Sequence, residues 1–183
     1  MIKAIEPLSK HDRSVFSCGV AELDAWFHQR AGQDDKRNVA RVFVAIDDQR
    51  GVVGFYRLSS FTLALTDLPS EHAKRLPRYD AIPAALIGRL ARDERARGAG
   101  VGDLLLADAV RRVLAAARSL AVFAIVVDAK DERAARFYRD FGFTSFPNRP
   151  FRLFMPVADA IEAMSRAQSE SRTQRKNLRG CRS

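Results

Sequence analysis

The feature that most constrains this fold is a run of alternating glycines, Gly98, Gly100 and Gly102, between a strand-like segment and an amphipathic helical pattern. Glycine permits positive φ and close backbone approach. The first N–H groups of the following helix have no internal acceptor, so they suit a bound phosphate. The sequence therefore predicts a loop that joins a strand to a helix and binds a phosphate-bearing ligand.

Two common phosphate loops do not match this stretch. A P-loop ends in Gly-Lys-Ser/Thr, whereas Gly102 is followed by Asp103. A dinucleotide fingerprint spaces its glycines G-x-G-x-x-G directly after a strand, whereas the charged residues 92–97 intervene here. A flexible surface turn is the alternative interpretation, and the regular spacing before a good helix argues against it.

The remaining pattern predicts a mixed α/β domain with helices packed on one sheet. Apolar alternation or short apolar runs predict strands, and 3.6-residue periodicity predicts helices. The expected strands are 2–8, 39–46, 52–65, 84–91, 120–127 and 151–157. The expected helices are 20–36, 103–118 and one within 128–143 that ends at Gly142, and 66–83 is expected to be loop or a short helix.

The chain has 183 residues, enough for one domain with a substantial core. We expect this domain to span residues 1–160 and a basic, disordered tail to span 161–183. No signal pattern or long apolar run is present, which predicts a cytoplasmic protein with no membrane segment. Cys18 and Cys181 are far apart and the three histidines are scattered, so no metal site is expected.

The formal net charge is +9. Residues 158–183 hold six Lys/Arg and three Asp/Glu and so contribute +3, which leaves +6 on the rest of the chain. A basic domain suggests a polyanionic partner such as nucleic acid, and a solvated arginine-rich surface is the alternative.

The order of elements and the motifs resemble the GNAT acetyltransferase superfamily. The pyrophosphate motif of that family, R/Q-x-x-G-x-G/A, matches Arg97, Gly100 and Gly102 in register. The later stretch "DERAARFYRDFGF" resembles the family's tyrosine-bearing helix and supplies Tyr138, although Asp131 stands where the family has asparagine.

Five segments narrow the resemblance to the GNAT toxins of bacterial type II toxin–antitoxin modules. They are "FSCGVAELDAWFHQRA", "VARVFVAIDDQRGVVGFYRLS", "RLPRYDAIPAALIGRLARDERARGAGVG", "LLLADAV" and "VVDAKDERAARFYRDFGF". The resemblance covers about residues 1–157. It implies a GNAT-like, mostly antiparallel central sheet with splayed central strands, flanked by helices.

The resemblance implies acetyl-CoA as co-substrate and no metal. The strand at Leu90–Arg92 would splay from strand 120–127, and a backbone N–H near Arg92 would bond the thioester oxygen. Arg95 or Arg97 would add charge-assisted bonds to the phosphates. The implied acetyl-CoA residues are Leu90, Ala91, Arg92, Arg97, Gly98, Ala99, Gly100, Val101 and Gly102.

Tyr138 matches the family's general acid, which protonates the departing CoA thiolate. The alternative is that Tyr138 and Phe137 only pack under the sheet. No serine, cysteine or histidine is placed as a nucleophile, so direct attack by an amine is expected. The lack of an evident strong base fits an α-amine, with a pKa of about 7.7–8.0, better than a lysine near 10.4.

The toxin group implies that the acceptor is the α-amine of aminoacyl-tRNA, that acetylation blocks translation, and that a homodimer forms. A DNA-binding antitoxin with a disordered toxin-wrapping segment would be the protein partner. Basic residues are expected to contact tRNA phosphates, and the candidates are Lys36, Arg37, Arg41, Lys74, Arg75, Arg78 and Arg89. Two alternatives stay open: an N-acetyltransferase for a small amine or protein N-terminus, and a non-catalytic nucleic-acid or CoA-binding module.

Overall fold

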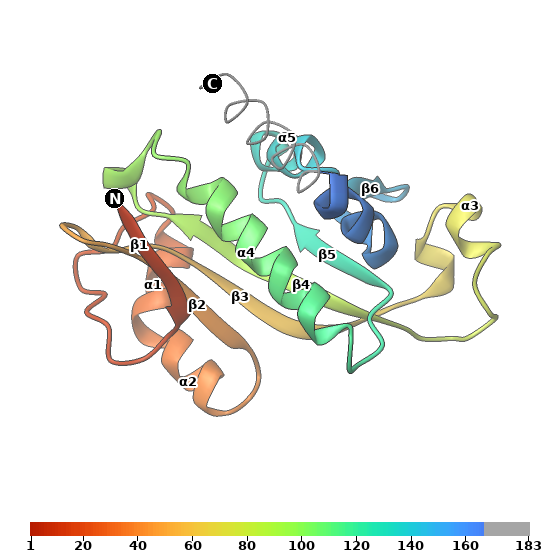
Figure 1. Ribbon diagram of the computed structural model, residues 1–183, viewed down its shortest axis with the longest axis horizontal. Coiled ribbons are helices and arrows are strands. Elements are labelled where there is room, and N and C mark those ends of the chain that lie inside the picture. The colour runs from red at the N-terminus through yellow and green to blue at the C-terminus, as the bar shows by residue number, and fades with distance from the viewer. Residues whose placement is uncertain (167–183) are drawn as a thin grey trace, which may run out of the picture.

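A twisted seven-stranded sheet organises the computed structural model, which describes residues 1–166 (Figure 1). The strand order is β1-β2-β3-β4-β5-β7-β6, and every neighbouring pair is antiparallel except β4–β5. The strands are β1 (Ile2–Pro7), β2 (Arg41–Asp47), β3 (Gly51–Leu63), β4 (Ile82–Arg92), β5 (Ala124–Asp128), β6 (Thr144–Phe146) and β7 (Arg149–Pro156). The expected mostly antiparallel α/β fold is confirmed.

Five α-helices and two short 3-10 turns accompany the sheet between Ala21 and Asp140. They are α1 (Ala21–Gln29), α2 (Ala31–Lys36), η1 (Leu65–Asp67), α3 (Ser70–Ala73), η2 (Glu94–Ala96), α4 (Val101–Ala116) and α5 (Glu132–Asp140). The single helix expected over 20–36 is wrong, because the chain breaks at Arg30 into α1 and α2. The expected end of α5 is confirmed, since Gly142 follows the helix with φ +110°.

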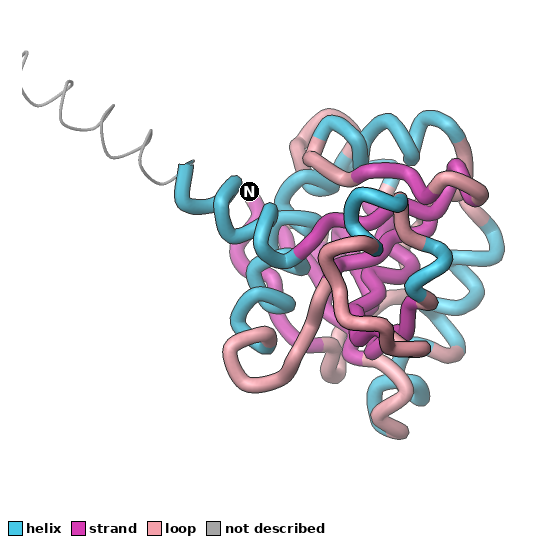
Figure 2. Tube along the Cα trace, turned by 90° about the vertical axis from the view of Figure 1, so that its right-hand side faces the viewer, coloured by secondary structure: helices cyan, strands magenta, loops and turns pink. Residues whose placement is uncertain are grey.

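The two faces of the sheet carry different helices (Figure 2). On one face α4 buries Leu105, Leu106 and Val113 against β3 and β4, and α5 buries Ala135 in the same cluster. Gly54 permits this close packing, because a Cβ there would lie 2.8 Å from Leu105 Cδ1.

On the opposite face α1 packs Trp26 and Phe27 against Phe55 of β3, and the Phe27 and Phe55 rings stack 4.1 Å apart. A separate cluster at the other end of this face joins Leu68 and Ile82 to the β5–β7 region. The middle of the face lies between these two clusters.

A β-bulge shapes the centre of the sheet. Arg57 pairs with Gly88 and Phe55 with Ala91, so two residues of β4, Arg89 and Leu90, stand opposite one residue of β3. Arg89 has φ +53°, a left-handed conformation that is uncommon for a non-glycine residue. The last β4–β5 pair is Ile87 with Val127, and beyond it the two strands separate. The expected splay of the central strands is therefore confirmed.

One buried carboxylate ties α4 to the sheet. Tyr56 of β3 donates a hydrogen bond to Asp108 Oδ2 at 2.5 Å, and Arg112 Nε donates to the same oxygen at 2.7 Å. Arg111 also pairs with Asp108, and Arg112 lies 4.0 Å from the centre of the Phe43 ring. Burial alone would raise the pKa of Asp108, but the bonds from Tyr56, Arg112 and Arg111 outweigh it, and the net pKa is lowered.

The end of the described chain differs from the expected domain boundary. Residues 157–166 are helical and cross position 160, where the domain was expected to end, and Ala160 is buried in the α4 cluster. The rest of the expected tail, 167–183, lies outside the described residues. None of the helices among residues 1–166 has the length and hydropathy that a membrane crossing requires.

Candidate active site

The glycine loop joins β4 to α4 at the edge where β4 has left β5. Gly98 and Gly100 have φ of +78° and +69°, and no heavy atom lies within 4 Å of a Cβ built on either of them. Leu104 N–H is the first in α4 with a helical acceptor, Gly100 O at 3.1 Å. The N–H groups of Val101, Gly102 and Asp103 thus have no acceptor within the helix, and no side chain caps it. This loop has the open space and donors that a diphosphate requires.

A buried carboxylate that the motif analysis missed anchors the start of this loop. Asp93 is 1% exposed and accepts hydrogen bonds from Ser17 N at 3.3 Å and Arg95 N at 2.8 Å. Its side chain also forms a two-point pair with Arg95 at 2.9 and 2.7 Å. Arg95 therefore stabilises the loop. It is less available than Arg97 to bind the phosphates of a ligand. Arg97 is exposed, with only a 3.8 Å contact to Glu94.

The separated strands form the second part of the site. Beyond Ile87 the edge of β4 that faces β5 has no ladder partner, and this edge includes Leu90, Ala91 and Arg92. After Val127 the chain continues to pair with β7 and not with β4, because the Ala129 N–H donates to Phe151 O at 2.7 Å. An extended ligand arm fits along the free β4 edge as an added strand, with its phosphate end at the glycine loop.

Tyr138 lies on α5, beside the opening between the separated ends of β4 and β5. Gly102 and α5 are close, because a Cβ on Gly102 would lie 3.7 Å from Phe137 Cζ. The Tyr138 side chain is 5% exposed and packs edge-on against Phe143. Burial, with a smaller effect of the Asp128 charge, raises its pKa to about 12, so the phenol keeps its proton at neutral pH. Phe137 is only partly buried, in line with the expectation that the two rings do not share one buried face.

Two other residues from the motif analysis have structural contacts. Asp131 caps α5 by accepting a hydrogen bond from Ala134 N at 2.8 Å, which is what its position before a helix favours. Burial and the nearby Asp24 raise the pKa of the Cys18 thiol to about 11, which leaves it protonated and a poor nucleophile. Cys181 lies outside the described residues.

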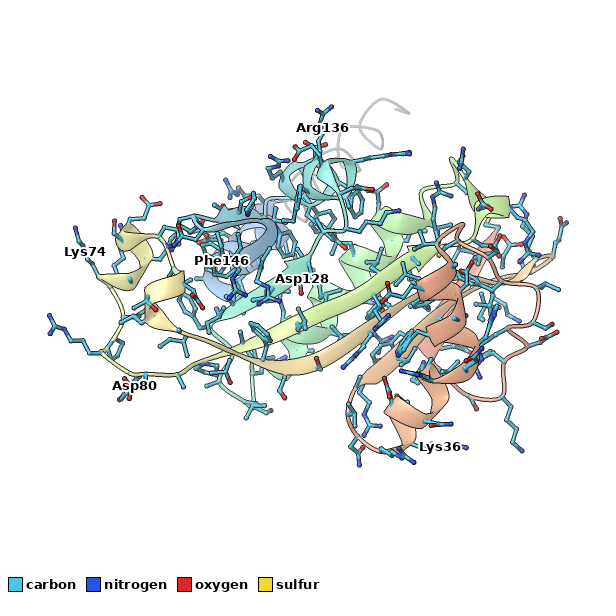
Figure 3. All side chains as sticks on the ribbon, turned by 180° about the vertical axis from the view of Figure 1, so that it is seen from behind. Lys36, Lys74, Asp80, Asp128, Arg136 and Phe146 are labelled. Atoms are coloured by element: carbon cyan, nitrogen blue, oxygen red, sulfur yellow. The ribbon has the colours of Figure 1, made fainter. Side chains whose placement is uncertain are left out.

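The candidate tRNA-binding residues do not form one cluster. Figure 3 shows Lys36 and Lys74 at opposite ends of the molecule. Lys36 ends α2 and Arg37 follows it, whereas Arg75 and Arg78 lie with Lys74 near α3, and all of these side chains are exposed. Arg41 is held by Asn38 Oδ1 at 2.7 Å. Arg89 lies on the β4 bulge, with its guanidinium 5.0 Å from the Trp26 ring of α1.

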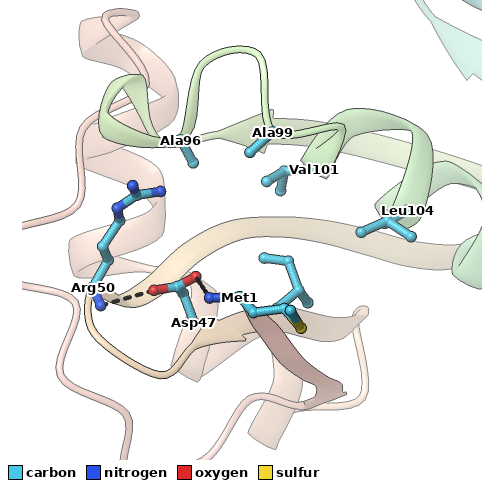
Figure 4. Close-up of a pocket in the computed structure, with 8 residues that line it drawn as sticks. Met1, Asp47, Arg50, Ala96, Ala99, Val101 and Leu104 are labelled. Carbon is cyan, nitrogen blue, oxygen red and sulfur yellow. Dashed lines mark hydrogen bonds and ion pairs between the residues drawn. The ribbon is translucent and has the colours of Figure 1, made fainter.

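A cavity of about 400 Å³ lies on the other side of the glycine loop, against the β2–β3 turn (Figure 4). Ala96, Ala99 and Val101 line it on the loop side, and Asp47 lines it on the other. Asp47 pairs with the Met1 ammonium at 2.8 Å, and this pairing, with backbone hydrogen bonds, lowers the pKa of Asp47 to about 2. The cavity includes neither the free β4 edge nor Tyr138. No cluster of three or more metal-ligating side chains occurs within residues 1–166.

The class of protein that this fold indicates is an acyl-CoA-dependent acyltransferase, because an uncapped helix N-terminus beside two separated strands suits a diphosphate with an extended arm. A family model for the acetyltransferase (GNAT) domain matches residues 38–145, and the chain belongs to this family. The co-substrate of this enzyme is acetyl-CoA, and the free β4 edge and glycine loop have the shape and donors to hold it.

Named relatives are bacterial toxins. The chain is 34% identical over 166 residues to "Probable toxin TacT" of Sinorhizobium fredii, covering 85% of this chain and 92% of that protein. It is 38% identical over 149 residues to a "tRNA-acetylating toxin" of Mycobacterium tuberculosis, covering 81% and 88%. A solved structure of AtaT complexed with acetyl-methionyl-tRNAfMet has a TM-score of 0.80 at 28% identity, covering 88% and 98%.

Substitution of Gly100 by alanine tests the loop. A left-handed conformation costs a non-glycine residue about 1–2 kcal/mol, so the loop is expected to relax and turn its N–H groups away. We expect acetyl-CoA to bind about tenfold more weakly, measured by isothermal titration calorimetry. Gly51→Ala is the matched control, because Gly51 has the same φ of +69° and equally open surroundings but is the first residue of β3, outside the glycine loop. Equal affinities for the two variants would contradict the assignment of the loop.

Proposed function

We propose that this acetyltransferase acetylates the α-amine of aminoacyl-tRNA and thereby blocks translation as a toxin. The observation that carries the proposal is that the unpaired edge of β4, the glycine loop and the helix that bears Tyr138 all follow the point where β4 and β5 separate. The names of the relatives support the acceptor, and so does the net charge of +9.

The chain's own residues divide the reaction into three tasks. Acetyl-CoA, when bound, supplies the acetyl thioester. In this proposal the N–H groups of Val101–Asp103 hold its diphosphate, and the backbone N–H near Arg92 donates to the thioester oxygen as negative charge develops on it. The uncapped start of α4 and the unpaired edge of β4 beyond Ile87 support these two assignments. The neutral acceptor amine forms the new C–N bond directly as the C–S bond breaks, and the Tyr138 hydroxyl gives its proton to the departing thiolate. The proton that the amine nitrogen loses on becoming an amide goes to solvent, and Tyr138 regains its proton from solvent. A Cys18 thiol held protonated fits direct transfer without an acyl-enzyme.

The amine needs little help from a base in this proposal. The α-amine of a free amino terminus has a pKa of about 7.7–8.0, and an adjacent ester lowers it further, so a good fraction is neutral at cellular pH. The residues proposed to contact tRNA phosphates are Lys36, Arg37, Arg41, Lys74, Arg75, Arg78 and Arg89. A toxin-wrapping, DNA-binding antitoxin, a homodimer and a cytoplasmic location complete the proposal; the toxin name of the relatives supports the antitoxin.

The test is transfer of labelled acetyl from acetyl-CoA to total charged tRNA, with deacylated tRNA as the control. We expect label on the aminoacyl group, and activity that falls as salt is added because phosphate contacts are screened. Label on free amino acids or peptides but not on charged tRNA would favour the small-amine alternative. Acetyl-CoA binding with no turnover on any amine would favour a binding module.

A further inference from the structure

Arg57 is a half-buried arginine on the sheet face opposite α4. Side chains of a strand alternate between faces, so Arg57 shares a face with Phe55, which stacks on Phe27 of α1. The α1 cluster covers one end of this face and the Leu68–Ile82 cluster covers the other. Arg57 lies in the stretch between them, beside the β4 bulge.

The guanidinium of Arg57 has no partner within the described chain. Its Nε is fully shielded and is the only such buried side-chain nitrogen or oxygen among residues 1–166 that lacks a hydrogen bond. No carboxylate of residues 1–166 forms an ion pair with it. A buried donor with no acceptor is costly, so an unpaired arginine here indicates an acceptor supplied from outside.

The side chain leans over β4 toward the opening. Gly88 pairs with Arg57 across the ladder, and the Cδ of Arg57 lies 4.0 Å from where a Cβ on Gly88 would be. A larger residue at Gly88 would stand in the path of this side chain. Gly88 immediately follows Ile87, the last β4 residue paired with β5, so Arg57 reaches the point where the strands part.

The charge around this point is uneven. Arg89, next to Gly88, contacts Trp26 and has no carboxylate partner among residues 1–166. On the β7 side Arg152 is neutralised by Asp128, with contacts of 2.7 and 2.9 Å. Asp128, labelled in Figure 3, ends β5 and directly follows Val127, the last β5 residue paired with β4. The β3–β4 side of the opening therefore carries unpaired positive charge.

We propose that Arg57 is a specificity-determining residue that binds an anionic oxygen of the acceptor close to the attacking amine. The proposal rests on the proposed function, since it assumes that the acceptor is aminoacyl-tRNA. The planar guanidinium pairs at two points with a carboxylate or a phosphate. Aminoacyl-tRNA offers both near its amine: the side-chain carboxylate of an acidic amino acid and the phosphate of the terminal nucleotide.

The experiment measures kcat/KM for acetyl transfer to tRNA charged with aspartate, glutamate, asparagine or glutamine. Wild type is compared with Arg57→Gln, Arg57→Lys and Arg118→Gln. Arg118 is exposed at the far end of α4 and is the control for loss of one positive charge. Thermal unfolding and acetyl-CoA affinity, expected to be unchanged, check that each variant is folded.

Two results support the proposal and identify the anion. If the anion is a side-chain carboxylate, Arg57→Gln lowers kcat/KM about 10- to 100-fold for the aspartyl and glutamyl substrates only. If it is the phosphate, the loss is equal for all four substrates and the slope of log KM against log salt falls by about one. Arg57→Lys keeps the charge and is expected to restore part of the loss in either case.

If Arg57→Gln has the same kcat/KM as wild type and Arg118→Gln on every charged tRNA, the proposed role of Arg57 is overturned. The proposed function is unaffected by that result. A loss confined to acetyl-CoA affinity or thermal stability would overturn the proposed role as well, because Arg57 would then be structural. Wild type that labels no charged tRNA would overturn the proposed function and this inference together.

Discussion

Replacing Tyr138 with phenylalanine is expected to lower kcat for acetyl transfer by about 10²- to 10⁴-fold, the usual contribution of a general acid. The ring keeps its packing against Phe143, so the melting temperature and acetyl-CoA affinity should stay at the wild-type values. Single-turnover acetylation of charged tRNA measures the effect on the chemical step. A variant with wild-type kcat would show that another group, or water, protonates the thiolate.

The pH dependence of wild type provides a second test of the same role. A pKa of about 12 keeps the Tyr138 phenol protonated throughout the accessible range. We expect kcat/KM to rise with pH as the acceptor amine loses its proton, below about pH 8, and then to stay level to about pH 10. If kcat/KM of wild type falls at alkaline pH with a midpoint below pH 10, and Tyr138→Phe shows no such fall, the raised pKa of Tyr138 is contradicted.

Replacing Asp108 with alanine is expected to lower the free energy of unfolding by about 3–5 kcal/mol, the range found when one partner of a buried pair is removed. The carboxylate receives hydrogen bonds from Tyr56 and Arg112, and the variant leaves both donors without it. Urea denaturation at pH 7 measures the loss. Asp80→Ala, at an exposed position labelled in Figure 3, is the control and should change stability by less than about 0.5 kcal/mol.

The sign of the pH effect follows from the lowered pKa of Asp108. The carboxylate's contribution is fully present above its unfolded-state pKa of about 3.9 and is lost as pH falls through the lower folded-state value. The stability gap between wild type and Asp108→Ala should therefore narrow below pH 4. A gap that is constant down to pH 2 would indicate that lost packing, not lost charge, destabilises the variant.

The parts of the site that local pattern defines were predictable. The glycine spacing, the amphipathic α4 and the end of α5 before Gly142 are all set by neighbours within a few residues, and the structure has these elements close to where the motifs predicted them. The roles of the loop and of Tyr138 in the reaction stay predictions. Arg57 was not found, because a polar residue in an alternating strand normally indicates a solvated face. Only the pairing with Gly88, 31 positions away, shows where its side chain goes.

Long-range pairing also explains the errors in the fold. The bulge at Arg89 depends on the register of β3 against β4, which no local window contains. The short strand β6 was missed, and β7 lies between β5 and β6, so that β6 forms the edge of the sheet. Asp108 sits in an apolar helix face as a single acid, and its burial depends on Tyr56, which is 52 positions away in the sequence.

The one parallel pair of strands governs where sequence change is tolerated. Parallel neighbours need a crossover connection, and α4 supplies it. The C-terminal end of β4, which leads into the glycine loop, and the C-terminal end of β5, which leads to α5, therefore lie side by side. The connection from α4 back to the sheet, residues 117–123, leads into the N-terminal end of β5, at the opposite end of the strand from α5. In the proposed site, a longer or shorter connection leaves the glycine loop and Tyr138 in place, whereas an insertion or deletion between Arg92 and Val101 moves the N–H groups of the loop relative to Tyr138.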